Sequence, residues 1–461
     1  MGPKTDFAAR HEAYAVARDH YVWPQLTHAE IEAGVPVIFA SGEGVLVRTV
    51  DGDEYIDLMS TVSRASTLGY GEKRIIDAVG HQLNRLHYGG TAKFQADVTI
   101  ELAAKLAGIA PGDLEATYFV GSGSEANEAA IKFAHFYQRT CGGKPRAYKV
   151  IARWNAYHGA AGGAMAASDW LGVRIPAEPG YPGYSRVPAP TCYRFPFGVD
   201  EKSCGEICVD LLEQHILHEG PDLVSAVIVE AVMQANGVQI PPPGYLAKIR
   251  EVCTRHNVLL IADEVVTGFG RTGEWFAVNH WDVKPDIMTM AKGLSAGYMP
   301  LGATMISRQI HESLDEFPDI HTYGGHPAAT MAALTAIEIY ESDGLIARAA
   351  EHGRTILDSL RPLEELEIVG QVRGLGMWAA IDFTSDPHTR AVPNPELLDF
   401  IVGRTRELGA LVGRNGTAIE VAPPFIISDD DLESGLSMFE QAVREGEERR
   451  LTYSSGGGAV Q

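Results

Sequence analysis

Residues 116–127 read ATYFVGSGSEAN, which is an apolar run followed by a glycine-rich turn and the start of a helix. Ser122 and Glu125 have the spacing of a capping box, and the glycines let backbone N–H groups approach an anion at the positive end of the helix. The motif therefore fits a phosphate site, although an ordinary capped turn would have the same sequence. The residues expected on the buried face of the helix are Ala126, Ala130, Phe133, Ala134 and Tyr137.

Similar apolar runs continue along the chain and alternate with helical stretches. They are KVIAR, SAVIVEAV, NVLLIADEV, DIMTMAK and LGATMIS. Strands that are buried on both faces of a parallel sheet have this continuous apolar texture, and their alternation with helices implies right-handed crossovers. The predicted fold class is therefore α/β.

The flanking segments have other patterns. The residues before Gly44 are polar and aromatic, and they predict an arm, with ordered structure beginning at Gly44. GVLVRTV and EYIDLM flank Asp51-Gly52, which predicts a hairpin. Beyond the helix that follows Pro327, strands such as GMWAAIDF among charged helices predict a smaller α+β domain. We expect an N-terminal arm and hairpin over residues 1–75 that belong to the small domain, a large domain over 76–335, a C-terminal small domain over 336–452 and a disordered tail over 453–461.

Composition narrows the class of protein. The chain has 461 residues, 45% of them hydrophobic and 21% charged, so it can bury a sizeable core. Its net charge of −22 argues against nucleic acid and anionic membranes as partners. We find neither a membrane-spanning stretch nor the apolar core of a signal peptide, and we expect a cytoplasmic protein. The scattered cysteines argue against a disulfide framework, and Cys204 and Cys208 have no second pair for zinc, so we expect no metal.

Two charged residues end further apolar runs. Asp263 lies where α/β sheets bind ligands, and it could hold a cationic ring nitrogen, bind a metal or cap the next turn. Lys292 would become nucleophilic if burial lowered its pKa, although such a lysine can also extend past the strand end into solvent. Together with GSGSEAN these residues are more specific, because pyridoxal phosphate needs an anion cradle, a counterion for its pyridinium nitrogen and a lysine for covalent attachment.

At this point the sequence resembles the class III (omega-amino acid) aminotransferases of the type I pyridoxal-phosphate fold. The motifs that carry the resemblance occur in the family's order: GSGSEAN, AYHG at 156–159, IVEAV at 228–232, LIADEVVTGFGRTG at 260–273, AKG at 291–293 and TYGGHP at 322–327. The resemblance implies a large, mostly parallel-sheet domain with a smaller α+β domain, in a homodimer or a dimer of dimers. It also implies ping-pong transfer of an amino group from an amine or omega-amino acid to a keto acid.

The resemblance assigns roles to individual residues. Lys292 would hold pyridoxal phosphate covalently and shuttle a proton, and Asp263 would pair with the pyridine nitrogen, with Glu230 and His158 supporting its surroundings. Around the cofactor, Val265 would pack beneath the ring, Tyr157 would stack on its other face, Gly123 and Ser124 would bind the phosphate, and Thr322 would reach the phosphate of the neighbouring subunit. The expected substrate-binding residues are Trp23, Arg64, Tyr157 and Arg414, of which Arg414 would bind the α-carboxylate of the keto acid.

Three positions depart from the family's pattern. Ala231 stands where proline is common, which affects only the local turn. Ala235 lies where relatives specific for GABA or ornithine often carry glutamate, so pyruvate is favoured over 2-oxoglutarate as the acceptor. Arg64 falls close to a pocket aromatic of amine-specific relatives, where it could face an acidic group on the donor or lie at the surface.

Other enzyme classes remain as alternatives. Residues 268–273 fit G-x-G-x-x-G, but no amphipathic helix pattern follows, which disfavours a nicotinamide-dependent dehydrogenase. An aminomutase, a racemase or a decarboxylase of the same fold could use the same lysine. A non-catalytic regulator of this fold would normally bring a basic DNA-binding module, which the sequence does not show.

Overall fold

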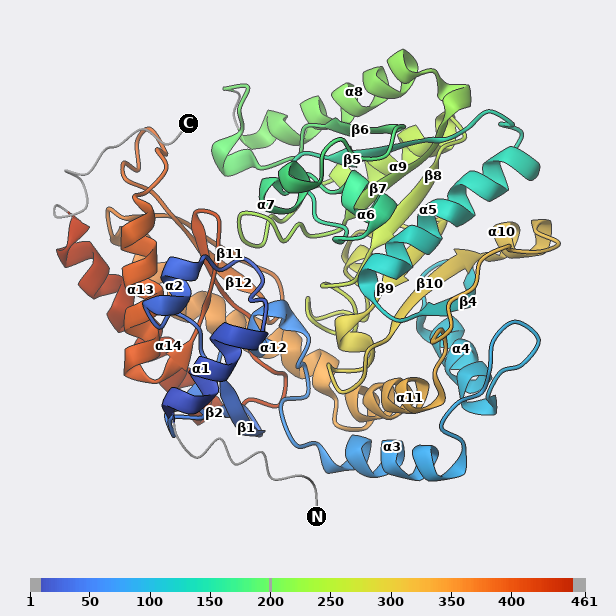
Figure 1. Cartoon of the computed structure of the whole chain (residues 1–461). Coiled ribbons are helices and arrows are strands. Elements are labelled where there is room, and N and C mark those ends of the chain that lie inside the picture. Colours follow the sequence, from blue (N-terminus) through green and yellow to red (C-terminus); the bar gives the residue numbers. More distant parts are fainter. Residues whose placement is uncertain (1–9, 199–200, 451–461) are drawn as a thin grey trace.

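The computed structural model describes residues 10–198 and 201–450 (Figure 1). The helices are α1 (Arg10–His20), α2 (His28–Glu32), α3 (Lys73–Arg85), α4 (Asp97–Ile109), α5 (Gly123–Thr140), α6 (Gly162–Ala167), α7 (Leu171–Arg174), α8 (Glu201–Glu219), α9 (Tyr245–Arg255), α10 (Arg308–Ser313), α11 (Pro327–Ser342), α12 (Leu345–Leu360), α13 (Pro395–Leu408) and α14 (Asp429–Glu448). The strands are β1 (Phe39–Glu43), β2 (Leu46–Thr49), β3 (Glu54–Asp57), β4 (Leu114–Val120), β5 (Lys149–Arg153), β6 (Tyr184–Val187), β7 (Val224–Glu230), β8 (Leu259–Asp263), β9 (Ile287–Met290), β10 (Gly302–Ser307), β11 (Val369–Gly374), β12 (Ala379–Phe383), β13 (Ala410–Leu411), β14 (Gly413–Asn415) and β15 (Ala418–Val421). The tail predicted over 453–461 lies outside the described residues.

The central sheet has seven strands in the order β4-β10-β9-β8-β7-β5-β6. The pairs from β9 through β6 are parallel, which confirms the predicted α/β class, whereas β10 is antiparallel to both β4 and β9. The connection from β9 to β10 covers only residues 291–301, too few for a crossover helix, so the chain returns in the opposite direction. Lys292 lies at the start of this return.

Both faces of the central sheet are buried. Along β7, Ala226 and Ile228 belong to one apolar cluster, whereas Val227 and Val229 belong to another. Helix α5 packs in the first cluster, and α8 and α9 pack in the second, so helices cover the sheet from both sides (Figure 1). Because successive residues of a strand point to opposite faces, apolar side chains are needed at every position, which explains the continuous runs in the sequence.

Two four-stranded sheets complete the fold, in the orders β1-β2-β3-β13 and β11-β12-β15-β14. The antiparallel pair β2 and β3 confirms the hairpin predicted around Asp51-Gly52. Strand β13 pairs in parallel with β3, with Ala410 opposite Ile56. The N-terminal elements therefore lie beside α13 and α14 from the end of the chain (Figure 1). The domain boundaries drawn from the sequence stay a prediction.

Three features differ from the sequence expectations. Residues 10–43 form α1, α2 and β1, where only an arm was predicted; Thr27 and Glu30 make a reciprocal capping box at α2. A disulfide joins Cys192, in the short helix η3 (Cys192–Arg194), to Cys204 in α8, although the scattered cysteines argued against such bonds. Strand β6 was missed because it lies at the sheet edge and is mostly half-buried, so it has no continuous apolar run.

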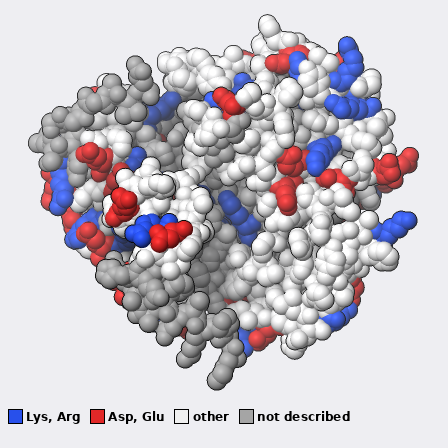
Figure 2. Space-filling view, in the orientation of Figure 1, with Lys and Arg blue, Asp and Glu red and all other residues white. Residues whose placement is uncertain are grey.

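The surface carries charges of both signs. Over the coloured part of the face shown in Figure 2, Asp and Glu side chains are spread among Lys and Arg side chains. Among the helices of the described residues, none combines the length and the hydropathy that crossing a membrane requires.

The close approach of α12 to the turn before β12 provides a test of the packing. A Cβ at Gly353 would lie 2.2 Å from the carbonyl oxygen of Gly376. Gly353→Ala should therefore destabilise the protein by about 1–3 kcal/mol and lower the temperature of thermal unfolding.

Gly403→Ala is the matched control, because Gly403 also lies within a helix, α13, but a Cβ there would meet no atom within 4 Å. This substitution should stabilise the protein by roughly 0.5–1 kcal/mol, since alanine loses less conformational entropy in a helix. Equal shifts in the unfolding temperature of the two variants would contradict the close approach at Gly353.

Candidate active site

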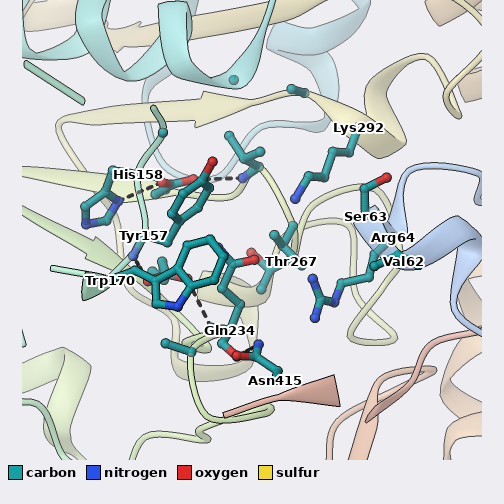
Figure 3. A pocket seen from close by; sticks show the side chains of 18 of the residues that line it. Val62, Ser63, Arg64, Tyr157, His158, Trp170, Gln234, Thr267, Lys292 and Asn415 are labelled. Carbon is teal, nitrogen blue, oxygen red and sulfur yellow. Dashed lines mark hydrogen bonds and ion pairs between the residues drawn. The ribbon is translucent and has the colours of Figure 1, made fainter. Parts of the chain in front are cut away.

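A cavity of about 570 Å³ opens at the carboxyl ends of β7, β8 and β9 (Figure 3). Glu230 ends β7, Asp263 ends β8, and Lys292 follows β9 after Ala291. The carboxyl ends of parallel strands meet at one edge of the sheet, where α/β folds bind ligands. The cavity wall also contains other residues that the sequence singled out, namely Arg64, Gly123, Ser124, Tyr157, His158, Ala235, Val265 and Arg414.

Asp263 is 4% exposed, and its carboxylate accepts hydrogen bonds from three segments. Asn127 Nδ2 lies 2.8 Å and His158 Nδ1 lies 2.7 Å from Oδ2. The backbone N–H of Val265 donates to Oδ1 over 3.0 Å. Because a buried charge without partners is costly, these donors stabilise the carboxylate at the cavity wall. In this place it can bind a cationic ring nitrogen.

Lys292 extends its amine into the cavity (Figure 3). Its backbone has a φ of +42°, in the left-handed region that few residues other than glycine adopt. Burial and, to a smaller extent, the positive charge of Arg64 lower the pKa of Lys292 to about 8. At pH 7 about a tenth of such a lysine is the neutral, nucleophilic amine, which is the form that attacks an aldehyde and is far rarer at the ordinary pKa.

The turn before α5 forms an anion cradle. Ser122 Oγ accepts the N–H of Glu125 over 3.2 Å, as the capping-box spacing predicts, but the Glu125 carboxylate accepts the N–H of Gly121 rather than that of the N-cap. A Cβ at Gly123 would lie 2.9 Å from a methyl carbon of Val265, so a larger residue would close the cradle. The N–H groups of the first helical turn have no acceptor within the helix and can bind a phosphate.

The segment around Tyr157 forms another wall. Its backbone N–H donates to Glu230 Oε1 over 3.2 Å, and burial raises the pKa of Glu230. The Tyr157 ring contacts the edge of Trp170, with 5.6 Å between ring centroids. The N–H of Ala160 donates to Ser124 Oγ over 3.3 Å, which ties this segment to the anion cradle. The hydrogen bond to Glu230 thus positions the backbone of Tyr157. Glu230 itself is paired with Asp263 on the adjacent strand.

The two predicted substrate arginines have different surroundings. Arg64 is 8% exposed, and it forms an ion pair with the fully buried Glu420, whose role the sequence did not indicate. Arg414 has a side chain that is 30% exposed, and it pairs with Asp399, which is 67% exposed. Ala235 is buried in the same cavity wall.

Two predicted site residues lie elsewhere. Thr322 is exposed and outside the cavity wall, and its carbonyl oxygen accepts the hydroxyl of Tyr88 over 3.1 Å. Trp23 is half-buried against Tyr21, with ring centroids 5.0 Å apart, and Gln25 lines the cavity in its place. Within the described residues of one protomer, the structure therefore does not bring Thr322 or Trp23 to the site.

Several cavity residues were not predicted. They include Trp170, Gln234, Thr267 and Asn415, which are labelled in Figure 3, together with Asn127. Asn127 ends the GSGSEAN motif, so its place one turn into α5 could have indicated a contact with Asp263. Thr267 lies within LIADEVVTGFGRTG and Asn415 follows Arg414, so both adjoin residues that the sequence singled out, whereas Trp170 and Gln234 lie in stretches without a distinctive pattern.

The residues present fit pyridoxal phosphate. Its phosphate matches the turn at Gly123 and Ser124, where a Cβ on Gly123 would come within 2.9 Å of Val265. The buried carboxylate of Asp263 matches a protonated pyridine nitrogen, and the amine of Lys292 matches an aldehyde carbon.

Comparisons with known proteins identify the family of the chain. The family model for Aminotransferase class-III matches residues 28–443. A taurine–pyruvate aminotransferase of Bilophila wadsworthia is 34% identical, over 94% of this chain and 97% of its own length. An uncharacterized aminotransferase of Bacillus subtilis is 36% identical, over 90% of this chain and 93% of its own length.

Solved structures give the same result. An (S)-enantioselective omega-transaminase from Thermomicrobium roseum has a TM-score of 0.91 and 34% identity, covering 95% of this chain and 99% of its own. The omega-transaminase from Pseudomonas jessenii in complex with PMP has a TM-score of 0.89 and 32% identity, covering 96% and 99%. These matches overturn the dehydrogenase alternative, and the chain belongs to the class III aminotransferases, enzymes of the type I fold that depend on pyridoxal phosphate.

Proposed function

We propose that this aminotransferase moves the amino group of an amine or an omega-amino acid to pyruvate by ping-pong chemistry through pyridoxamine phosphate. The observation that carries the proposal is the presence, in one cavity, of the buried amine of Lys292 and the partly exposed guanidinium of Arg414. Relatives named as taurine–pyruvate aminotransferases support the choice of acceptor.

Arg414 is suited to a carboxylate that must bind in only one half of the reaction. Its ion pair with Asp399 is exposed on both sides, and such pairs contribute only about 0–1 kcal/mol. The carboxylate of a keto acid can therefore replace Asp399 and accept two parallel hydrogen bonds from the guanidinium. A donor without an α-carboxylate would leave the ion pair intact.

The wall near Ala235 supports pyruvate as the acceptor. Relatives specific for GABA or ornithine often carry an acid at this position, which can pair with an arginine and release it, whereas alanine cannot, so the glutamate-switch mode of 2-oxoglutarate recognition is disfavoured. Pyruvate has a single carboxylate, so Arg414 is sufficient to bind it.

The other residues hold the cofactor and move protons. Asp263 would bind the pyridine nitrogen, Gly123 and Ser124 the phosphate, and Tyr157 one face of the ring. Pyridoxal phosphate supplies an electron sink when it is bound. The amine of Lys292, whose pKa is lowered to about 8, would take the proton from the substrate's Cα and return it to C4′ of the cofactor.

A homodimer accounts for the position of Thr322. Residues 88–95 and 316–324 adjoin, and they expose the large apolar side chains of Phe94, Ile320 and Tyr323. Exposed apolar side chains that cluster in this way are typical of an interface. We infer that a second copy covers them and that Thr322 completes the phosphate site of that copy; a dimer of dimers and a cytoplasmic location stay predictions.

Sedimentation at assay concentration tests this assembly. It should give a dimer or tetramer, and Ile320→Asp should shift the mass toward the monomer, because an interface cannot bury an unpaired charge cheaply. A fully active monomer would contradict the role of Thr322 in a neighbouring site.

Borohydride labelling tests the role of Lys292. The reagent should fix the cofactor on Lys292, and Lys292→Ala should lower turnover at least about 100-fold while leaving a folded protein, because attachment and proton transfer both need the amine.

Lys144 is the matched control, because burial also lowers its pKa to about 8, but its amine donates to the carbonyl oxygens of Val224 and His256, outside the cavity. Lys144→Met should keep the label and the turnover of the folded protein. Cofactor fixed on any other lysine would overturn the assignment.

Arg414→Ala tests the acceptor half of the reaction. The KM for pyruvate should rise about 10- to 100-fold, the equivalent of a charge-assisted hydrogen bond, whereas the half-reaction with an amine donor should change little. Asp399→Ala, which frees Arg414, should leave the KM for pyruvate unchanged or lower it. An unchanged KM in Arg414→Ala would show that another group binds the keto acid.

A further inference from the structure

A polar cluster borders the cavity that contains Lys292; two of its residues line the cavity wall and the other two are buried behind it. It consists of Arg64, Trp378, Asn415 and Glu420, and we name it the Arg64 subsite. Glu420 Oε2 accepts Arg64 Nε over 2.9 Å, a second bond from Arg64 Nη2, and Trp378 Nε1 over 2.8 Å. Glu420 Oε1 accepts Asn415 Nδ2 over 2.7 Å.

Glu420 orients Arg64. The carboxylate is completely buried, so its donors must remain in place to stabilise the charge. The two hydrogen bonds from Arg64 to Glu420 use the Nε and Nη2 atoms of Arg64. Among the described residues, none accepts a hydrogen bond from Nη1. The Trp378 ring lies 5.4 Å from the guanidinium carbon and limits its rotation. Figure 3 shows the guanidinium pointing into the cavity.

The backbone also holds Arg64 in this place at a cost. Ser60, Thr61 and Arg64 have φ values of +43°, +49° and +61°, and such conformations cost about 1–3 kcal/mol each outside glycine. The N–H of Thr61 donates to Asp57 over 2.7 Å, and the buried Arg271 donates to Ser60 Oγ over 3.0 Å. A segment strained and braced in this way places its side chains with little freedom.

The Nη1 atom of Arg64 lies within reach of an amine substrate bound in the cavity. The donor nitrogen must react beside the Lys292 amine, and the positive charge of Arg64 contributes to the lowered pKa of that amine. Both side chains point into the same cavity (Figure 3). The distal end of a short donor can therefore meet Nη1.

We propose that Arg64, held by Glu420, determines donor specificity and selects amines with a hydrogen-bond acceptor at the distal end. This inference deepens the proposed function and rests on it. Because Glu420 balances the charge of Arg64, the subsite is neutral overall and presents an N–H rather than a bare cation. A neutral acceptor, such as a hydroxyl, is therefore bound nearly as well as a carboxylate.

Three donors of nearly equal size test the proposal: n-butylamine without an acceptor, 3-amino-1-propanol with a neutral one and β-alanine with an anionic one. The absorbance change of the cofactor with donor alone gives the efficiency of the half-reaction, independently of pyruvate. In the wild type, aminopropanol should exceed butylamine about 10- to 100-fold, and β-alanine should lie within a few-fold of aminopropanol.

Two variants separate the charge of the subsite from its shape. Glu420→Gln keeps an acceptor for Arg64 but removes the counter-charge, so the preference for β-alanine over aminopropanol should rise about tenfold. The double variant Arg64→Leu with Glu420→Leu removes both charges, which buried pairs tolerate better than loss of one partner, and it should erase the preference for aminopropanol over butylamine. Ratios between donors cancel the folded fraction of each variant, so a merely structural role would leave them unchanged.

The outcomes distinguish this inference from the proposed function. Equal efficiency for all three donors in the wild type, or unchanged ratios in both variants, would overturn the subsite and leave amine transfer intact. A wild type that reacts with alanine but with none of the three donors would contradict the proposed donor class, and the subsite with it.

Discussion

The carboxylate of Asp263 imposes the constraint on which the site depends. A charge that is 4% exposed must be surrounded by donors, and these come from α5 through Asn127, from the segment after β5 through His158, and from the turn after β8. The same three segments carry the glycine turn before α5, Tyr157 and Val265. Satisfying one buried carboxylate therefore also sets the relative positions of the groups that would hold the phosphate and both faces of the ring.

Two backbone segments with positive φ border the cavity that contains this carboxylate. Lys292 and residues 60–62 and 64 all have positive φ, although none is glycine. Lys292 can take this conformation because β9 and β10 are hydrogen-bonded on either side of the short return, and Ser60 is held by Arg271, which has buried carbonyl acceptors at Met377 and Pro423. Strain of this kind persists only where the surroundings over-determine it, as happens at ligand sites.

The sequence predicted the central strands because burial on both faces leaves continuous apolar runs, and it predicted Lys292 and Asp263 because charges at the ends of such runs are conspicuous. It missed β6, whose half-buried edge position leaves no such run. It also missed Glu420, because that acid lies in the apolar strand β15 and its partner Arg64 is 356 residues away. Local patterns reveal the strand ends, whereas pairings between distant segments arise only from tertiary packing.

Burial separates the two arginines of the cavity into different roles. Each has an acidic partner, yet Asp399 is 67% exposed whereas Glu420 is fully buried. Water solvates Asp399 when its partner leaves, so Arg414 can exchange it for a substrate carboxylate at little cost. If Arg64 moved away, the buried carboxylate of Glu420 would lose its ion-pair partner without gaining contact with water, so Arg64 must stay in place. Under the proposed function, Arg414 is thus free to follow a substrate that is present in half of the cycle, while Arg64 keeps a fixed orientation at the cavity wall.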